Sequence, residues 1–493
     1  MPLTVSVVIP VYNGERYLRA CLEHIQRSDA APLECIVVDD GSTDGSAAVA
    51  REFGAGVISS ERLGPAAARN LGAEKAKGDI LFFLDADVCV HPETVSRVLW
   101  NFERDPALDA LIGSYDDSPG SEDFLSQYRN LMHSFVHQHA REEACTFWSG
   151  CGAIRRDIFL AYSGFDQSYG RPAIEDIELG SRLVHAKRKL ILDKTLLVKH
   201  LKRWTFWNLV KTDIVDRGIP WTELILRDRH MPNDLNVQVS ERISVALVFI
   251  LFGLAAEGTI RYGGYFLTPF VAILIFLLAM YWVKSTSQPQ SKGVSILMLV
   301  VVGVFIWLAY IHNMLPMAPP VLLGYALLFF RGRYVQDKKR RQIVTGMAYA
   351  AYLVFAVIFT LTFLPRRPIV FGVYAVLLLV VIINREFYLF FGGKRGWITA
   401  LAVVPFHLLY HFYNGISFIV GSIRYTWKAL GRRYQRQAQF AGQAKAFPDQ
   451  AFPDEATERT SPSDPRAPMG GPAEAEQVTP GDLSAASGPP QHP

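Results

Sequence analysis

Hydrophobic and polar positions divide this chain of 493 residues into two contrasting parts. Up to about Asn236, short apolar runs alternate with charged segments, a pattern typical of a soluble α/β domain. From Ile243 to Tyr425 the apolar runs are long and contain few charges. Because a helix needs about 20 apolar residues to cross a bilayer, the second part predicts a helical membrane region.

The first part alternates strand and helix patterns. Three apolar runs predict strands, at Ser6–Val11, Leu33–Asp40 and Ile80–Leu84. Helical patterns lie between them, from about Glu15, over Ala47–Phe53 and from Pro65. This alternation predicts a mostly parallel sheet, in which ligands bind beyond the carboxyl ends of the strands. Four polar residues fall at those ends: Asn13, Asp39, Asp40 and Asp85.

Two carboxylates follow the strand at Ile80–Leu84, namely Asp85 and Asp87. Paired carboxylates are typical ligands of Ca²⁺, Mg²⁺ and Mn²⁺, and an ion bound by so few protein groups keeps positions open for phosphate oxygens. Taken alone, the pair is explained more simply as the cap of a turn. The surrounding motifs must therefore distinguish a metal site from a turn.

The second part contains seven apolar runs. They lie at Ile243–Ala256, Gly264–Val283, Val294–His312, Met317–Phe330, Ile343–Leu364, Ile369–Ile383 and Trp397–Val420. If the first domain is cytosolic, six crossings place the basic residues from Arg331 to Arg341 and from Arg385 to Arg395 on the cytosolic side. A seventh crossing would place the basic segment Arg424–Arg436 outside. We therefore expect the last run, which contains Pro405, His407 and His411, to be re-entrant or interfacial.

Composition narrows the function classes further. A formal net charge of +4, without a basic stripe, gives no support for nucleic-acid binding. Five cysteines lack metal-ligand spacing, so we expect reduced thiols in a cytosolic domain. Beyond about Gln437 the chain is rich in Ala, Pro, Gln, Glu and Ser, which predicts a disordered tail.

Four motifs in the first part match one family in the same order. They are VSVVIPVYNGE, VVDDGSTDGS, GPAAARNLGAEKAKGD and ILFFLDADV. With them the chain resembles the family 2 glycosyltransferases over roughly Leu3 to Trp204. The resemblance implies a GT-A fold, which is a Rossmann-like α/β domain with a mostly parallel sheet, and a hexosyltransferase activity that uses a nucleotide sugar.

The resemblance also implies the residues that bind the donor. Pro10, Tyr12 and Glu15 would line the nucleotide pocket, and Asp40 would accept a hydrogen bond from the base. Arg69 would add positive charge near the diphosphate, although a salt bridge on the helix surface is an equal alternative. Gly150 lies in the sequence FWSGCG, which resembles the small-residue loop beneath the donor sugar.

The same resemblance assigns the chemistry. Asp85, Asp87 and His200 would hold Mg²⁺ or Mn²⁺ at the diphosphate, and Asp176 in IEDIEL would be the catalytic base of an inverting transfer. Arg203 and Trp204 would lie on the acceptor side. His200 stands where processive synthases have Gln in a QxxRW motif, which weakens the case for processivity. Trp204 and Trp207 can also be interfacial anchors.

These observations predict a metal-dependent inverting transferase acting on a UDP- or GDP-sugar and on a lipid-linked or glycan acceptor of the cell envelope. The expected parts are a GT-A domain at 1–204, interfacial helices at 205–240, six or seven membrane segments at 241–425 and a basic, then disordered tail at 426–493. The catalytic domain would lie on the cytosolic face of the plasma membrane. A processive polysaccharide synthase and a transporter that keeps a GT-A-like binding module are the alternatives.

Overall fold

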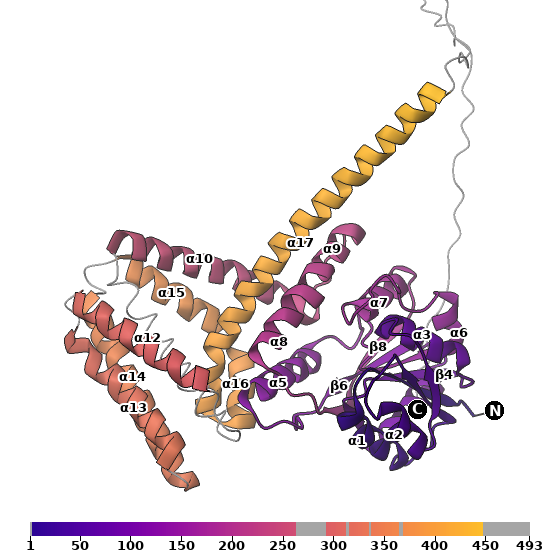
Figure 1. The fold of residues 1–493 in the computed structure, drawn as a ribbon, viewed down its shortest axis with the longest axis horizontal. Helices are drawn as coiled ribbons and strands as arrows, with labels where there is room; N and C mark the ends of the chain where they lie inside the picture. The colour runs from indigo at the N-terminus through magenta and orange to yellow at the C-terminus, as the bar shows by residue number, and fades with distance from the viewer. Residues whose placement is uncertain (1, 263–291, 312–314, 335–336, 364–367, 447–493) are drawn as a thin grey trace, which may run out of the picture. The chain divides into compact units, whose positions relative to one another are not determined.

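The structure, a computed structural model, describes residues 2–262, 292–311, 315–334, 337–363 and 368–446 (Figure 1). The described residues up to Gly431 form one compact unit. The apolar run expected at Gly264–Val283 and the tail beyond residue 446 lie outside the described residues.

An eight-stranded mixed sheet organises the N-terminal part, in the order β3-β2-β1-β4-β7-β6-β8-β5. The strands are β1 (Val5–Val11), β2 (Glu34–Asp39), β3 (Gly56–Ser59), β4 (Ile80–Leu84), β5 (Val88–Val90), β6 (Ala110–Tyr115), β7 (Cys151–Arg155) and β8 (Leu190–His200). β1, β2, β3 and β4 pair in parallel, whereas β7 is antiparallel to both β4 and β6. The expected α/β class with a largely parallel sheet is therefore confirmed.

Register explains why the polar residues after the strands share one edge. Val11 of β1 pairs with Asp39 of β2, and Val8 pairs with Phe83 of β4. The carboxyl ends of these parallel strands therefore point the same way, and Asp40 and Asp85 follow them directly.

Helices cover both faces of the sheet. One hydrophobic cluster joins it to α1 (Glu15–Gln26), α2 (Ser46–Glu52) and α4 (Thr94–Arg104). Another joins its opposite face to α3 (Pro65–Lys75), α6 (Arg156–Ala161) and α7 (Glu175–His185). All five side chains of β4 are buried, because the strand lies between these two layers.

The helical part that follows packs against α5 (Phe124–His139). Its elements are α8 (Phe206–Lys211), η1 (Thr212–Gly218), α9 (Ile219–Asp228), η2 (Leu235–Val237), α10 (Val239–Tyr262), α12 (Lys292–Ile311), η3 (Leu315–Met317), α13 (Ala318–Tyr334), α14 (Lys338–Phe363), α15 (Pro368–Ile383), α16 (Arg385–Arg395) and α17 (Trp397–Ala446). α10 packs on α15, α13 packs on α14, and α5 contacts α16 (Figure 1).

Two helices among the described residues are long and apolar enough to cross a membrane, at Val239–Arg261 and Trp397–Arg432. A third candidate is the pair Phe371–Ile383 and Arg385–Arg395, which is bent by 67°. Shorter apolar helices lie at Val302–Ile311 and Leu315–Leu328. The runs expected at Ile243, Val294, Met317, Ile343, Ile369 and Trp397 thus all lie on helices, while the number of crossings stays a prediction.

The expectation that the last apolar run is re-entrant is wrong, whereas the interfacial alternative stays a prediction. α17 continues without a break from Trp397 through Pro405 to Ala446. A proline removes one backbone hydrogen bond, and a long apolar helix packed on neighbours can continue past that loss. α17 therefore has no turn that would make it re-entrant, and its length is that of a candidate crossing.

Candidate functional site

The acidic pair lies at the carboxyl edge of the sheet, immediately after β4. Asp85 keeps about a third of its side chain exposed (34%) and accepts a hydrogen bond of 2.7 Å at Oδ1 from Arg69. Asp87 is more enclosed and faces His200 at the end of β8, with 3.6 Å between Oδ2 and Nε2. The two carboxylates therefore have different partners.

Arg69 is the central cation of this edge. It projects from the second turn of α3 and is 5% exposed. Its Nη2 donates to Asp85, and its Nη1 donates to Glu175 Oε1 over 2.9 Å. The expected alternative of a salt bridge on the helix surface is wrong, because the guanidinium lies in the interior and joins the loop after β4 to the start of α7.

Asp87 is held in its ionised form. Burial opposes its charge, but the His200 imidazole and the Lys202 ammonium outweigh this and lower the pKa of Asp87 to about 2. His200 is itself positioned by Asn130, whose Oδ1 lies 2.5 Å from Nδ1, and by stacking on the Tyr115 ring. Its Nε2 is therefore the nitrogen directed to Asp87.

Asp176 lies in the first turn of α7. Its Oδ2 accepts hydrogen bonds from the backbone N–H and the hydroxyl of Ser149, at 3.0 and 3.1 Å. Burial and the neighbouring Glu175 charge raise the pKa of Asp176 to about 6, although the Ser149 bonds and Arg69 act in the opposite direction. This carboxyl can therefore exchange a proton near neutral pH.

The loop between Trp148 and Gly152 brings Ser149 to Asp176. A Cβ on Gly150 would lie 2.8 Å from the Trp148 ring, and one on Gly152 would lie 2.4 Å from the Trp148 carbonyl oxygen. Only glycine fits both places. The two glycines of the sequence GCG thus allow the tight turn that leads into β7.

The residues expected to bind the nucleotide surround the ends of β1 and β2. Tyr12 is 42% exposed and carries the Arg62 guanidinium over its ring, at 4.2 Å from the centroid. Glu15 accepts from the Gly45 N–H, and Pro10 lies within β1. Asp40 is buried and accepts hydrogen bonds from Ser60, Leu63 and Gly64. Asp40 thus holds the loop before α3, and its contact with a base stays a prediction.

The acceptor-side residues differ in their surroundings. Trp204 is 5% exposed and packs with α5 and α17 in a hydrophobic cluster. Arg203 is partly exposed and lies 3.9 Å from Asp123. Because Trp204 is buried, it cannot be an interfacial anchor, whereas Trp207 is 75% exposed and fits that description.

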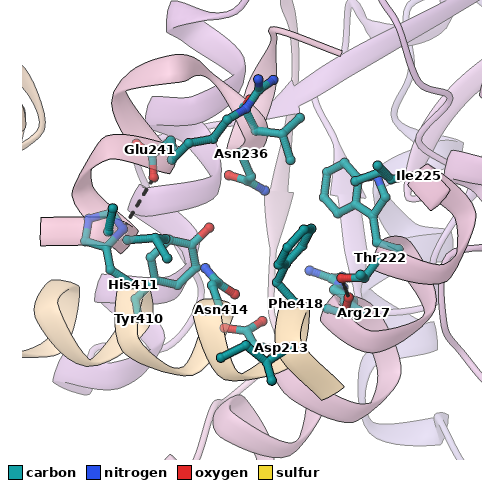
Figure 2. A pocket seen from close by; sticks show the side chains of 18 of the residues that line it. Asp213, Arg217, Thr222, Ile225, Asn236, Glu241, Tyr410, His411, Asn414 and Phe418 are labelled. Atoms are coloured by element: carbon teal, nitrogen blue, oxygen red, sulfur yellow. Dashed lines mark hydrogen bonds and ion pairs between the residues drawn. The ribbon is translucent and has the colours of Figure 1, made fainter. Parts of the chain in front are cut away.

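A cavity of about 460 Å³ lies among the helices that follow the sheet, with Arg129 of α5 at its wall (Figure 2). Its wall combines aromatic and aliphatic side chains of α9, α10 and α17 with the polar residues Asp213 and Arg217 of η1. Arg129 pairs with Asp213 at 2.7 Å, and Asp213 also accepts a hydrogen bond of 2.6 Å from the Tyr413 hydroxyl of α17. This buried network fixes the side of the cavity next to α5.

Arg217 gives the cavity a second cation. It lines the wall together with Trp221 and Phe418, and it lies near enough to Asp176 to lower the pKa of that carboxyl (Figure 2). Arg129 is neutralised by Asp213, but no ion pair of Arg217 occurs within the described part of the chain. The cavity therefore offers the positive charge of Arg217 beside an apolar wall.

Sequence patterns did not reveal several of these residues. Glu175 directly precedes Asp176, but its role as a partner of Arg69 depends on a contact across 106 positions. Ser149 and Arg217 have no distinctive spacing from Asp176. Asp85, Asp87 and His200 do not form a group with ligand atoms all within 4.8 Å, judged on the residues that the structure describes.

Comparison with known proteins now identifies the class. Residues 6–162 match the model of the glycosyl transferase family 2. The glycosyltransferase GlyG of Streptococcus pneumoniae is 36% identical over 126 residues, which cover 24% of this chain and 42% of GlyG. The undecaprenyl-phosphate 4-deoxy-4-formamido-L-arabinose transferase of Aeromonas hydrophila is 40% identical over 105 residues, or 19% of this chain and 32% of that protein.

The mannosyltransferase PcManGT of Pyrobaculum calidifontis, solved with GDP-Man and Mn²⁺, has a TM-score of 0.34 at 17% identity, over 73% of this chain and 88% of that chain. This chain spans less than half the length of the two curated relatives. Residues 6–162 are therefore similar to the family 2 glycosyl transferases, which confirms the resemblance inferred from the motifs.

Removal of Arg69 tests the connection between the two acidic motifs. Arg69→Ala leaves Glu175 buried without its cation, so we expect a stability loss of about 3 to 5 kcal/mol, measured by denaturant unfolding of the full chain in detergent micelles. The control is Arg19→Ala, which breaks the exposed pair with Glu52 and should change stability little. Equal stabilities of the two variants would contradict the role of the buried pair.

Proposed function

We propose that this protein is a membrane-associated inverting glycosyltransferase that moves a hexose from a UDP- or GDP-sugar to a lipid-linked acceptor. The observation that carries the proposal is the joining of two acidic motifs by Arg69 at one edge of a family 2 domain. One motif, Asp85 and Asp87, suits the diphosphate of the donor. The other contains Asp176, which suits the acceptor hydroxyl.

Asp85 and Asp87 would hold Mg²⁺ or Mn²⁺. The donor set fits such an ion, because Asp87 is ionised and Asp85 keeps part of its carboxylate exposed. His200 can contribute Nε2, since its Nδ1 is engaged by Asn130. When bound, the ion supplies positive charge that stabilises the departing nucleoside diphosphate.

Asp176 would be the base. Inversion requires one carboxylate that removes the proton of the acceptor hydroxyl while the leaving group departs from the opposite face of the sugar. The Ser149 hydrogen bonds to Oδ2 fix the carboxylate orientation. A pKa raised to about 6 leaves Asp176 ionised at neutral pH while making it a stronger base than a solvated aspartate.

The cavity lined by Arg217 supports a lipid-linked acceptor. Its apolar wall includes residues of α10 and α17, which are the two candidate membrane helices, and Arg217 can bind a phosphate group near the catalytic part. The name of the Aeromonas hydrophila relative refers to undecaprenyl phosphate, which has this combination of anion and hydrocarbon. We place the catalytic domain on the cytosolic face, as the distribution of basic residues predicts.

The base assignment can be tested by Asp176→Asn, which keeps the size of the side chain and removes its ability to accept a proton. We expect turnover to fall by about 10²- to 10⁴-fold while donor binding, measured by calorimetry, is retained. Asp157→Asn, an exposed position on α6, is the matched control. In the wild type, kcat/KM should rise as pH increases through about 6, because the carboxyl then loses its proton. Normal turnover by Asp176→Asn would exclude the base role.

Metal dependence can be tested at Asp87. We expect Asp87→Ala to abolish sugar transfer, and we expect a chelator to abolish wild-type transfer until Mg²⁺ or Mn²⁺ is restored, since both changes remove the charge that faces the diphosphate. Radiolabelled sugar transfer into membrane lipid is the measurement, with Asp157→Ala as control. Full activity in the presence of chelator would contradict the metal proposal.

Arg217 provides a test of the acceptor. Arg217→Ala should raise KM for a polyprenyl phosphate by roughly ten- to hundredfold, the cost of losing a charge-assisted contact, while KM for the donor changes little. Arg217→Lys should recover part of the loss, and Arg104→Ala on α4 serves as the control. An unchanged acceptor KM, measured by initial rates in detergent, would show that the phosphate does not bind at Arg217.

A further inference from the structure

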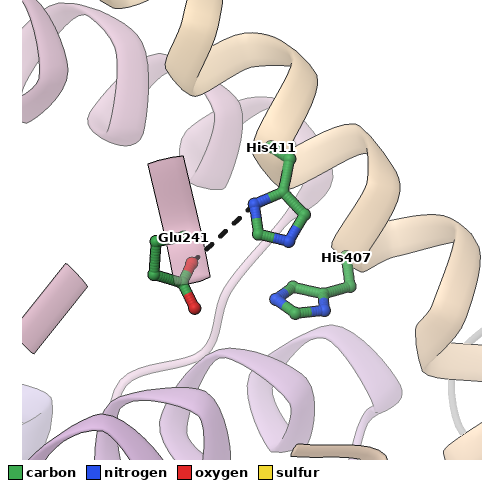
Figure 3. Close-up of side chains that lie close together, drawn as sticks. All are labelled: Glu241, His407 and His411. Carbon is green, nitrogen blue, oxygen red and sulfur yellow. Dashed lines mark ion pairs between the residues drawn. The ribbon is translucent and has the colours of Figure 1, made fainter. Parts of the chain in front are cut away.

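A second group of ligand-type side chains lies away from the acidic edge of the sheet. Glu241 stands in the first turn of α10, and His407 and His411 stand one turn apart on α17. Each offers a ligand atom, and these atoms all lie within 4.8 Å of one another. Figure 3 shows the Glu241 carboxylate facing the two imidazoles of α17. Within the described residues this is the one group of three such side chains.

His411 is the residue that most requires an explanation. It is 0% exposed, and neither of its ring nitrogens makes a hydrogen bond within the described part of the chain. Nδ1 lies 3.8 Å from Glu241 Oε2, which is too long for a hydrogen bond. A buried imidazole without a partner costs about 1 to 3 kcal/mol of stability. The described protein atoms thus leave the His411 nitrogens without the partner that would offset this cost.

His407 is positioned as a metal ligand would be. Its Nδ1 lies 3.2 Å from the Tyr388 hydroxyl of α16, and its ring packs on Phe387 at 4.1 Å between centroids, with the two planes tilted by 31°. With Nδ1 engaged by Tyr388, Nε2 is the nitrogen left to bind an ion. Such an outer contact fixes both the orientation and the tautomer of a histidine ligand.

We propose that Glu241, His407 and His411 bind a divalent transition-metal ion of the zinc class. Two imidazoles and one carboxylate are a donor set that Zn²⁺ accepts, with metal to ligand distances of about 2.0 to 2.2 Å. Ligand atoms around one tetrahedral ion of that size lie about 3.4 Å apart. Side-chain rotations that move the ligand atoms by about 1 Å therefore complete the site. The ion satisfies the His411 nitrogen that the protein leaves without a partner.

The position of this site suggests what the ion does. The site joins the start of α10 to the first third of α17, two helices that are far apart in sequence. Glu241 and His411 also line the 460 Å³ cavity, so the fourth coordination position of a three-ligand ion is directed to that space. The ion therefore links the two candidate membrane helices and leaves one position for water or an anionic group.

This metal site is chemically distinct from the pair Asp85 and Asp87. The acidic pair offers carboxylate oxygens, which favour Mg²⁺ and Mn²⁺, whereas two imidazole nitrogens favour Zn²⁺ and Co²⁺. The proposal does not depend on the transferase reaction, because binding of the ion can be measured without a sugar donor. The two sites can therefore be tested separately in one protein.

The test uses the purified full chain in detergent, stripped with chelator and then dialysed against Zn²⁺ in excess Mg²⁺. We expect about one Zn²⁺ per wild-type chain by mass spectrometry of the metal, and an affinity at least about tenfold lower for His407→Ala and His411→Ala. Asp87→Ala should keep the ion. His139→Ala, which removes an exposed histidine of α5, is the matched control and should also keep it.

Two results would overturn the proposal. One is a wild-type chain that takes up no Zn²⁺, which would mean that Glu241 and His411 form an ion pair only. The other is loss of Zn²⁺ in Asp87→Ala with retention in the histidine variants. Because a histidine variant can fail to fold, a second measurement uses Co²⁺ bound to the wild type. The absorption bands of Co²⁺ should report nitrogen and oxygen ligands in a four- or five-coordinate site. A spectrum of an octahedral aqua ion would contradict the assignment.

Discussion

A guanidinium enclosed by protein must be surrounded by negative charge, and this constraint organises the catalytic edge of the sheet. Arg69 reaches its enclosed position because α3 packs closely on β1, where a Cβ on Gly72 would lie 2.5 Å from Val8. The cost of removing the cation from water is offset only when Asp85 and Glu175 both remain beside it. The loop after β4 and the start of α7 are thereby held together at one guanidinium.

Local patterns predicted the elements whose burial is uniform. The strand at Ile80–Leu84 has the bounds of β4, since five apolar residues between two helical layers leave no ambiguity. Pro65 marked the start of α3, because a proline is favoured in the first helical turn. The first two residues of β7, Cys151 and Gly152, were assigned to a small-residue loop. The antiparallel strand that they begin depends on pairing with β4 and β6, which sequence alone does not show.

Contacts between distant segments limited the prediction of the site. Asp87 and His200 were recognised through motifs, whereas the partners Glu175 and Ser149 became visible only when α7 was placed against the loop before β7. Similarly, His407 and His411 could be seen as neighbours on a helix, but nothing in their spacing indicates Glu241. Too much weight was given to Pro405 as a sign of a re-entrant segment. The free energy that a proline costs a helix is smaller than the free energy gained from the packing around it.

The buried network of Arg129, Asp213 and Tyr413 has a consequence for dissecting the protein. The cluster around it contains side chains of α5, α8, α16 and α17, so the hydrophobic interior continues past the end of the sheet domain. A chain cut after Trp204 would expose this interior and leave Arg129 without its carboxylate. We therefore expect fragments that end at Trp204 to expose an apolar surface and to be prone to aggregation.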